Sequence, residues 1–300
     1  MSNNKRRFFL RYISILQKLR TQDASFDEIS DYLQQISKNT GNDLSVSQRT
    51  FQRDINDIND IFNIEILANS MDKYYIADGG DPMRQKRTLE TFDQLDLLYR
   101  AKTPSRYVFF EKREASGSEN IPGVLHAIYK REPTNFKYEK YWEDSFSYRT
   151  VEPLVLKECQ NRWYMIACDR KDGKIKTFGL DRVSEMTFEK EKFEYPNDFD
   201  ADQIFKDSFG IISEGKVEEL ILSFDVDQKR YLGSLKLHDS QEVLIDDEDE
   251  YRIRLYIKIT HDLKMEIMSY GDAVEVLSPK SLRSEMKKRY SRALKYYSKN

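Results

Sequence analysis

Two arginines and one asparagine recur at helical spacing in the first part of the chain. Residues 46–55 read Val-Ser-Gln-Arg-Thr-Phe-Gln-Arg-Asp-Ile. At about 100° per residue, Arg49, Arg53 and Asn56 fall on one side of a helix whose apolar residues fall on the other. Arginine binds guanine through two hydrogen bonds, asparagine binds adenine in the same way, and both also reach phosphate oxygens. The pattern therefore predicts a helix that contacts DNA.

The residues around this helix favour the same structure. Ser47 is a good N-cap, and Val46 and Phe51 are placed to pack together as a hydrophobic staple. Two short β-like segments, 64–67 and 73–76, flank a polar turn and predict a hairpin. The residues expected to contact DNA are Ser47, Gln48, Arg49, Thr50, Gln52, Arg53, Asn56 and, at the hairpin turn, Lys73.

Two helices must precede and support the DNA-contacting one. Residues 7–20 carry an apolar stripe at helical spacing, and a second helix begins at Ser25, which is placed to form a capping box with Glu28. A polar, glycine-containing loop, 37–43, follows it. Three helices and a hairpin predict a DNA-binding domain over residues 1–80. The alternative is a small helical domain whose outward arginines are only solvated.

The run from Ser47 to Ile55 resembles the S-x-R-T-x-x-R-D-[IL] signature of the helix-turn-helix that heads WYL-domain regulators. The resemblance implies a winged helix-turn-helix that binds double-stranded DNA. This sequence departs from the family pattern by a long polar insertion, 37–44, before the DNA-contacting helix.

The middle of the chain changes its periodicity. Residues 81–134 are predicted as a helical linker, with one helix over 88–102. From residue 135 the apolar residues alternate with period two, and Asp172-Gly173 is a strong signal for a tight hairpin. Several short antiparallel strands predict a small curled sheet or barrel over 135–195.

Within these strands the chain resembles the WYL domain in both order and spacing. The matching residues are Arg149 and Pro153, then Trp163-Tyr164-Met165, then Phe178-x-Leu180-Asp181-Arg182. Methionine replaces the family's leucine at Met165, which nearly conserves volume. The resemblance implies an Sm-like β-barrel that senses a ligand, often a nucleotide or a nucleic-acid fragment.

By matching position, a set of basic and aromatic residues is implied to bind this ligand. The set is Tyr138, Arg149, Tyr164 and Arg182, with Lys174 and Lys176 as weaker candidates. Arginine can bind phosphate through two hydrogen bonds, and aromatic rings stack on bases. The competing interpretation is that the tyrosines and Trp163 are core residues and that Arg182 pairs with Asp181.

The last third reads as a separate module. Residues 196–214 are a polar connection, and residues 215–300 follow a β-α-β-β-α-β-α order in which Ser278 caps a last helix with Pro279 as its first residue. Its ending resembles the WCX extension that follows WYL domains, by Gly271, Val274-x-Val276-Leu277, Ser278-Pro279 and Leu282-Arg283. The resemblance implies a ferredoxin-like module that supports dimerisation. The basic last helix is either a solvated face or a further DNA contact.

Composition excludes several classes of protein. The 49 Lys and Arg nearly balance the 52 Asp and Glu, so the chain is no globally basic coat protein, although a local basic patch is still allowed. Cys159 and Cys168 are nine apart with no histidine nearby, so neither a metal site nor a cofactor is expected. No catalytic motif is present, so no enzyme is expected. No apolar stretch could span a membrane, which favours a cytoplasmic protein.

The sequence therefore predicts an α+β multidomain protein with a winged helix-turn-helix, an Sm-like β-barrel and a ferredoxin-like module. The expected function is a homodimeric transcription regulator that binds DNA and responds to a nucleotide or nucleic-acid effector. The alternative is an accessory nucleotide- or nucleic-acid-binding module of a defence system, without recognition of duplex DNA.

Overall fold

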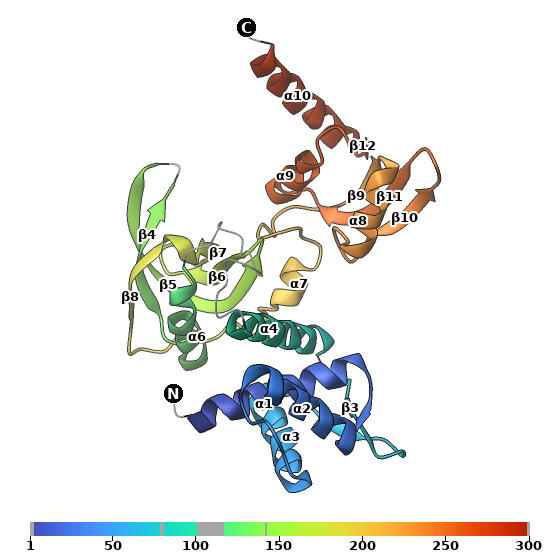
Figure 1. Cartoon of the computed structure of the whole chain (residues 1–300). Coiled ribbons are helices and arrows are strands. Elements are labelled where there is room, and N and C mark those ends of the chain that lie inside the picture. The colour runs from blue at the N-terminus through green and yellow to red at the C-terminus, as the bar shows by residue number, and fades with distance from the viewer. Residues whose placement is uncertain (1–2, 79–80, 101–116, 142, 299–300) are drawn as a thin grey trace. The chain divides into compact units, whose positions relative to one another are not determined.

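The computed structural model of the chain describes residues 3–78, 81–100, 117–141 and 143–298 (Figure 1). The chain divides into two compact units, residues 1–112 and 113–300. The described residues form antiparallel sheets of three, five and four strands, each with its own hydrophobic core. None of the described helices combines the length and the apolar character needed to cross a membrane.

The first unit begins with three helices and a small sheet. Its elements are α1 (Asn3–Thr21), β1 (Ala24–Ser25), α2 (Phe26–Thr40), α3 (Gln48–Phe62), β2 (Ile66–Ala68) and β3 (Lys73–Ile76). The sheet has the order β1-β3-β2, so the expected hairpin gains a third strand in which Ser25 lies opposite Lys73. Two residues are too few to show a period, and β1 was therefore not predicted.

The caps of α2 and α3 agree with the sequence. Ser25 and Glu28 form the expected capping box, and the Ser47 side chain accepts a hydrogen bond from the Thr50 amide. Helix α2 runs further than expected and ends at Gly41, whose left-handed φ of 69° suits glycine. The following loop is fixed by Leu44, which is fully buried and whose amide donates to the Ser37 hydroxyl.

A buried ion pair joins α1 to α3. The Arg11 guanidinium donates to both carboxylate oxygens of Asp54, at 2.5 and 2.6 Å, and the two side chains are 1% and 0% exposed. A second contact joins the same helices: the hydroxyl of Tyr12, the residue after Arg11, donates to Asp57, three residues after Asp54, at 2.7 Å. Burial and this hydrogen bond raise the pKa of Tyr12. These contacts fix which face of α3 turns toward the core.

Helix α4 (Pro82–Arg100) belongs to the first unit. Phe92 is 5% exposed and lies in the same core, with its ring centroid 4.6 Å from that of Phe62. Gln17 of α1 donates to Asp96 of α4. The segment expected as one helical linker, 81–134, is thus divided: α4 packs on the first unit, and α6 (Ile121–Lys130) packs on the second.

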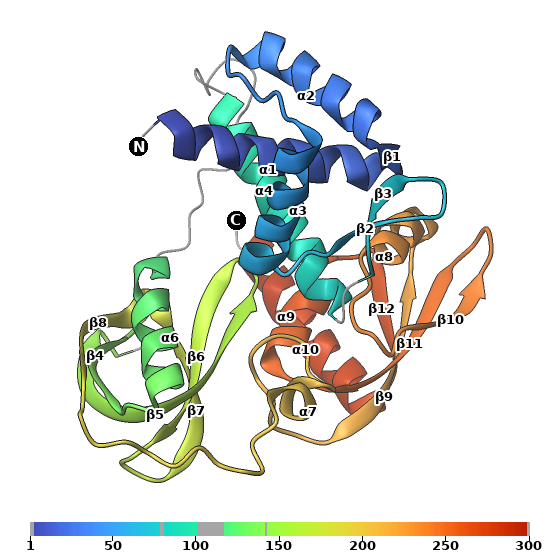
Figure 2. The ribbon, with the colours of Figure 1, turned by 90° about the horizontal axis from the view of Figure 1, so that it is seen from below.

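The five-stranded sheet curls around a core that α6 helps to close (Figure 2). Its strands are β4 (Thr134–Lys140), β5 (Ser145–Cys159), β6 (Arg162–Asp169), β7 (Lys174–Gly179) and β8 (Val183–Phe188), in the order β7-β6-β5-β4-β8. The first half of β5 pairs with β4 and the second half with β6, with a register shift between Pro153 and Val155. This long strand therefore carries the curvature. Met165 is fully buried and Trp163 packs against the same core.

The last part of the chain is a four-stranded sheet with helices. After α7 (Ala201–Phe205) come β9 (Val217–Phe224), α8 (Lys229–Ser234), β10 (Glu242–Asp246), β11 (Tyr251–Lys258), α9 (His261–Ser269), β12 (Val274–Ser278) and α10 (Lys280–Tyr297). The strand order β10-β11-β9-β12, all antiparallel, is that of a ferredoxin-like βαββαβ unit with α10 added. Alternate residues of β9 and β11 are buried, so one face of the sheet meets the helices.

One expected cap is wrong. Ser278 does not cap α10, because it closes β12 opposite Ile221. Pro279 takes the cap position instead, and α10 begins at Lys280 without a side-chain cap.

The buried ion pair gives the first testable prediction. Asp54→Ala leaves the Arg11 guanidinium buried without its counter-charge, so the free energy of unfolding of the first unit should fall by about 3–5 kcal/mol. Loss of hydrogen-exchange protection in α1 and α3, in the full chain, measures this. Asp60→Ala removes an exposed carboxylate from the same helix and should cost less than about 0.5 kcal/mol. Equal losses in the two variants would contradict a structural role for the pair.

Candidate nucleic-acid and ligand sites

The outward face of α3 carries most of the residues expected to contact DNA. Arg49, Arg53 and Asn56 are all exposed, whereas Phe51 and Asp54 on the same helix are buried. Within the described parts of the chain, neither arginine forms an ion pair. Gln48 and Gln52 are also exposed. The helix therefore presents two free guanidinium groups and three amides along its first half.

The other three candidates are engaged locally. The Ser47 hydroxyl caps α3 and lies 3.0 Å from the Thr50 hydroxyl. Lys73 begins β3 directly after the hairpin turn, and its ammonium lies 3.8 Å from Glu28. Within the turn, Ser70, Met71 and Asp72 are exposed. The strand register places Lys73 beside Ser25, which the sequence pattern did not reveal.

Arg182 lies between two tyrosines of the five-stranded sheet. Its guanidinium carbon is 5.0 Å from the ring centroid of Tyr138 and 5.3 Å from that of Tyr141, which is the geometry of cation–π contacts. The Tyr138 hydroxyl accepts a hydrogen bond from the Gly179 amide, and burial raises the pKa of this tyrosine. A side chain at Gly179 would meet the Arg182 guanidinium at 3.2 Å, so glycine permits this close approach.

The acidic neighbour of Arg182 is largely occupied elsewhere. Asp181 is held at 2.5 Å by Arg162, whereas its distance to the Arg182 Nε is 3.9 Å. The Arg182–Asp181 pair is therefore long, and the Arg182 guanidinium keeps hydrogen-bonding capacity for a ligand.

A pocket of about 380 Å³ opens beside Arg182. It is lined by Lys137, Glu139, Asp144, Ser145, Phe146, Asp181, Arg182, Val183 and Ser184. Phe146 is 56% exposed, and the Lys137 ammonium lies 4.4 Å from its ring centroid. Phe146, Lys137 and Tyr141 were not predicted from the sequence as site residues. They come from β4, from β5 and from the turn between these strands, and it is the pairing of the two strands that brings them beside Arg182.

Tyr164 lies next to this group rather than in the pocket. It is paired with Gly179 across β6 and β7, and the Gly179 amide reaches Tyr138. Burial raises the pKa of Tyr164, and the nearby charge of Arg182 opposes that shift. Three of the six expected ligand residues, Tyr138, Tyr164 and Arg182, are thus brought together.

The remaining three lie around a different carboxylate. Asp169, 1% exposed, accepts hydrogen bonds from Lys176 at 2.8 Å and from Arg149 at 3.0 Å, and Lys174 faces it across β6 and β7. Asp169 and Tyr164 are five residues apart on β6, roughly 16 Å along the strand. The structure therefore divides the six expected ligand residues into two groups: Arg149 and Lys176 neutralise Asp169 and lie away from Arg182.

The two cysteines take no part in either group. Cys159 and Cys168 are free thiols, and burial raises the pKa of both, which disfavours the reactive thiolate. Among the residues that the structure describes, no three of His, Cys, Asp and Glu gather as they would around a metal ion.

The Asp169 group gives a prediction about pH. Burial raises the pKa of Asp169, but hydrogen bonds from Lys176 and the Lys171 amide and the charge of Arg149 outweigh burial and hold it below its usual value. Its contribution to stability is therefore present above the unfolded pKa, near 3.9, and is lost as pH falls through the lower folded pKa. Asp169→Asn should lower the urea midpoint of this domain at pH 7, and the difference from the parent chain should shrink below about pH 4. A difference that does not depend on pH would contradict this role.

Two family models match the chain: the WYL domain over residues 119–188 and the WCX domain over residues 216–294. Among solved structures, proteasome accessory factor B/C (PafBC) of Arthrobacter aurescens is 21% identical, with a TM-score of 0.37. The match covers 92% of this chain but only 45% of that one. A CRISPR Cas-related protein is 10% identical over 97% of this chain and 84% of its own, with a TM-score of 0.40. No curated protein matches. The chain therefore carries a WYL domain followed by a WCX domain.

Proposed function

We propose that this protein is a DNA-binding transcription regulator whose activity responds to a nucleotide or nucleic-acid ligand bound by its WYL domain. One observation carries the proposal: α3 turns two arginines outward, neither of which forms an ion pair with another described residue, while a buried ion pair on its other side fixes its orientation. Such a helix is rigid, basic and accessible along its first half. Those are the properties of a helix that enters the major groove.

The order of elements supports a winged helix-turn-helix. Helices α1, α2 and α3 precede the β2–β3 hairpin, and β1 adds an edge strand between the first two helices. In this assignment α3 is the recognition helix and the hairpin is the wing. Arg49, Arg53 and Asn56 would contact base edges or phosphates.

The group around Arg182 supports binding of a nucleotide-like ligand. A guanidinium backed by two rings suits a phosphate, and the exposed rings of Tyr141 and Phe146 offer stacking surfaces for a base. The pocket volume of about 380 Å³ lies in the range of small-molecule sites. The curled sheet would serve as the Sm-like barrel that presents these residues.

We further propose that the regulator acts as a homodimer. Two copies related by a two-fold axis would place two α3 helices in successive major grooves of a partly palindromic site. The charge pattern agrees with a local rather than a global attraction to DNA, because the whole chain has a net charge of −3.

The DNA-binding part is tested by selecting fragmented genomic DNA from the source organism with the purified chain. Arg53→Ala should weaken binding to the enriched sites by about 1–3 kcal/mol, which is about fivefold or more, with little change in thermal stability. Arg84→Ala is a matched control, since Arg84 is exposed in the same unit but lies on α4. If neither the parent chain nor the Arg49→Ala/Arg53→Ala variant enriches duplex DNA, the first unit does not read DNA, and an accessory nucleic-acid-binding module becomes the better description.

The ligand-sensing part is tested at Arg182. Arg182→Ala should abolish the response to the effector while leaving DNA binding without effector unchanged, because the substitution lies outside the first unit. Titration of nucleotides and short oligonucleotides into the full chain, followed by calorimetry, measures the loss. An unchanged response would remove Arg182 from the site, and the same loss in Lys176→Ala would show that the Asp169 group also takes part.

A further inference from the structure

The pocket beside Arg182 contains two carboxylates that the proposed function does not use. Glu139 lies near the end of β4, Asp144 lies in the turn that leads into β5, and both are exposed. Neither forms an ion pair or a hydrogen bond with another residue that the structure describes. An ionised carboxylate only accepts hydrogen bonds. The pocket therefore offers two acceptors to the donors of a ligand.

The strand register explains why Glu139 reaches this pocket. The pairing of β4 with β8 ends at Tyr138, opposite Val183, whereas its pairing with β5 continues to Lys140. Glu139 therefore lies where β4 has passed the start of β8, and it faces the same side of the sheet as Lys137. Two residues along a strand span about 7 Å. An ammonium and a carboxylate thus line one wall of the pocket at roughly this separation.

The charges around the pocket do not favour a ligand with many negative charges. Two cations and three carboxylates line it: Lys137, Arg182, Glu139, Asp144 and Asp181. Lys137 also lies 3.5 Å from Glu185, and Asp181 lies 2.5 Å from Arg162, so each of these two charges has a partner of its own. The Arg182 guanidinium then faces a ligand together with two carboxylates. Coulomb repulsion opposes a polyphosphate there, whereas a single phosphate can still pair with the guanidinium.

An exposed ring lies beside one of the two carboxylates. Phe146 is directly opposite Glu139 across β4 and β5, so their Cβ atoms are about 5 Å apart. A base that stacks on the ring of Phe146 can turn its polar edge toward the Glu139 carboxylate. The pocket thus combines a guanidinium for phosphate, a ring for stacking and carboxylates for the edge of the base.

Guanine presents the donors that a carboxylate accepts best. Its N1–H and its 2-amino group lie side by side and can donate to both oxygens of one carboxylate. Adenine and cytosine each carry one amino group beside a ring acceptor, and uracil carries one N–H between two carbonyls. A carboxylate repels those acceptors. Carboxylates without partners in a nucleotide pocket therefore favour guanine.

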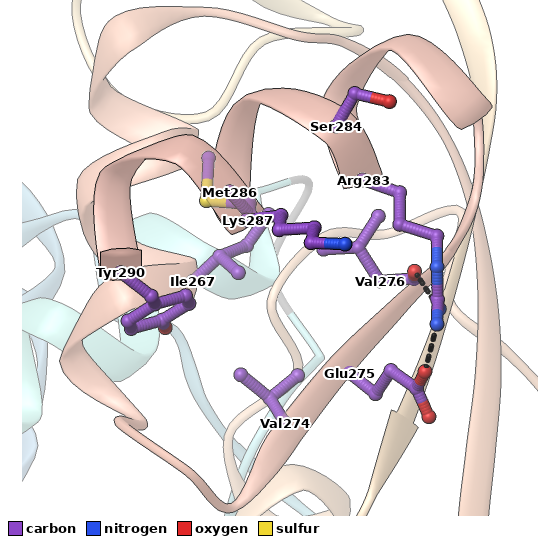
Figure 3. A pocket seen from close by; sticks show the side chains of 9 residues that line it. All are labelled: Ile267, Val274, Glu275, Val276, Arg283, Ser284, Met286, Lys287 and Tyr290. Carbon is purple, nitrogen blue, oxygen red and sulfur yellow. Dashed lines mark hydrogen bonds and ion pairs between the residues drawn. The ribbon is translucent and has the colours of Figure 1, made fainter. Parts of the chain in front are cut away.

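A larger hollow, of about 560 Å³, lies between β12 and α10 but lacks this combination (Figure 3). Arg283 donates to the Val276 carbonyl at 2.8 Å and forms an ion pair with Glu275, so these charges already have partners. Much of the remaining lining is apolar, including Ile267 and Val274. The pocket beside Arg182 is the better fit to a nucleotide, although it is smaller.

From these observations we infer that the pocket beside Arg182 takes a guanine nucleotide with a single phosphate. Arg182 binds the phosphate, and the carboxylates of Glu139 and Asp144 accept the donors of the base. The inference rests on the proposed ligand-binding function and names the base and the charge of the ligand. A free guanosine monophosphate and a guanine within a single-stranded oligonucleotide share this chemistry.

Guanosine and inosine 5′-monophosphates (GMP and IMP) supply the test, because they differ only in the 2-amino group. Calorimetric titration of the full chain should give a dissociation constant at least about fivefold lower for GMP than for IMP, and GMP should also bind more tightly than guanosine triphosphate (GTP). In Glu139→Gln/Asp144→Asn, the preference for GMP over IMP should fall below about twofold, and GTP should gain affinity relative to GMP. Both measurements compare ligands on one protein, so a general loss of folding would not change the ratios.

Glu143→Gln is the matched control. Glu143 is an exposed carboxylate in the same turn, but it pairs with Lys140 at 2.6 Å and does not line the pocket. This variant should keep the parent preference for GMP over IMP.

Thymine oligonucleotides with one central guanine or one central inosine distinguish the two sources of the ligand. Tighter binding of GMP than of the guanine oligonucleotide would assign the pocket to a free nucleotide. The reverse order, again with guanine preferred over inosine, would assign it to a guanine within a single strand. Either order agrees with the inference.

Four results would overturn the inference: equal affinities for GMP and IMP in the parent chain, tighter binding of GTP than of GMP, a preference for GMP that Glu139→Gln/Asp144→Asn leaves unchanged, or no binding of any guanine probe. Failure of the proposed function is distinguishable. Binding of uridine monophosphate or of a thymine oligonucleotide that depends on Arg182 but shows no preference for guanine would keep a nucleotide-binding WYL domain and lose this inference. A preference for guanine without any effect on DNA binding would keep this inference and lose the regulator.

Discussion

The contact between Arg11 and Asp54 determines what the first unit can present. Arg53 and Asp54 are neighbours, and at about 100° per residue a helix sends them in different directions. Because Asp54 is fully buried on the Arg11 guanidinium, Arg53 must turn outward. A buried, bidentate pair tolerates little rotation or sliding of α3, since either would leave a charge unpaired in the core. Of these two neighbouring residues, Asp54 thus holds the inner face of α3 in the core, and Arg53 is the candidate DNA contact on the outer face.

The curled sheet uses charge in two ways at its two ends. At one end, Asp169 of β6 forms ion pairs with Arg149 of β5 and Lys176 of β7, so these two cations link three strands. At the other end, the carboxylate of Asp181 is taken by Arg162, which leaves Arg182 supported by rings rather than by an anion. A cation held by rings keeps its hydrogen-bond donors for a ligand, whereas a cation held by a buried carboxylate does not. This difference, and not residue type, separates the candidate site from the structural group.

Local features were predictable from the sequence, and long-range pairings were not. The caps of α2 and α3 and the outward face of α3 depend on residues within one or two helical turns, so period and spacing were sufficient. The role of Asp54 depends on Arg11, a residue 43 positions away. In the sequence, Asp54 could be recognised only as one position of the helix-turn-helix signature. The division of the ligand residues depends on the register of β4 to β7, in which Phe146 lies opposite Glu139, and alternation alone does not give that register. The contact of Lys73 with Glu28 was not predictable for a similar reason, because β1, which places Ser25 opposite Lys73, is too short to show a period.

The separate cores constrain how a ligand could act on DNA binding. Each sheet has its own core, and the polar contacts that orient α3 lie wholly within the first unit. A ligand shifts an equilibrium only by its difference in affinity for the two states. If a ligand binds at Arg182 as proposed, breaking the Arg11–Asp54 pair would cost about 3–5 kcal/mol, which exceeds a typical coupling free energy of about 1–3 kcal/mol. In the proposed two-fold regulator, a ligand would instead change the spacing of the two folded first units. Two α3 helices bind one DNA duplex tightly only at the spacing of successive major grooves.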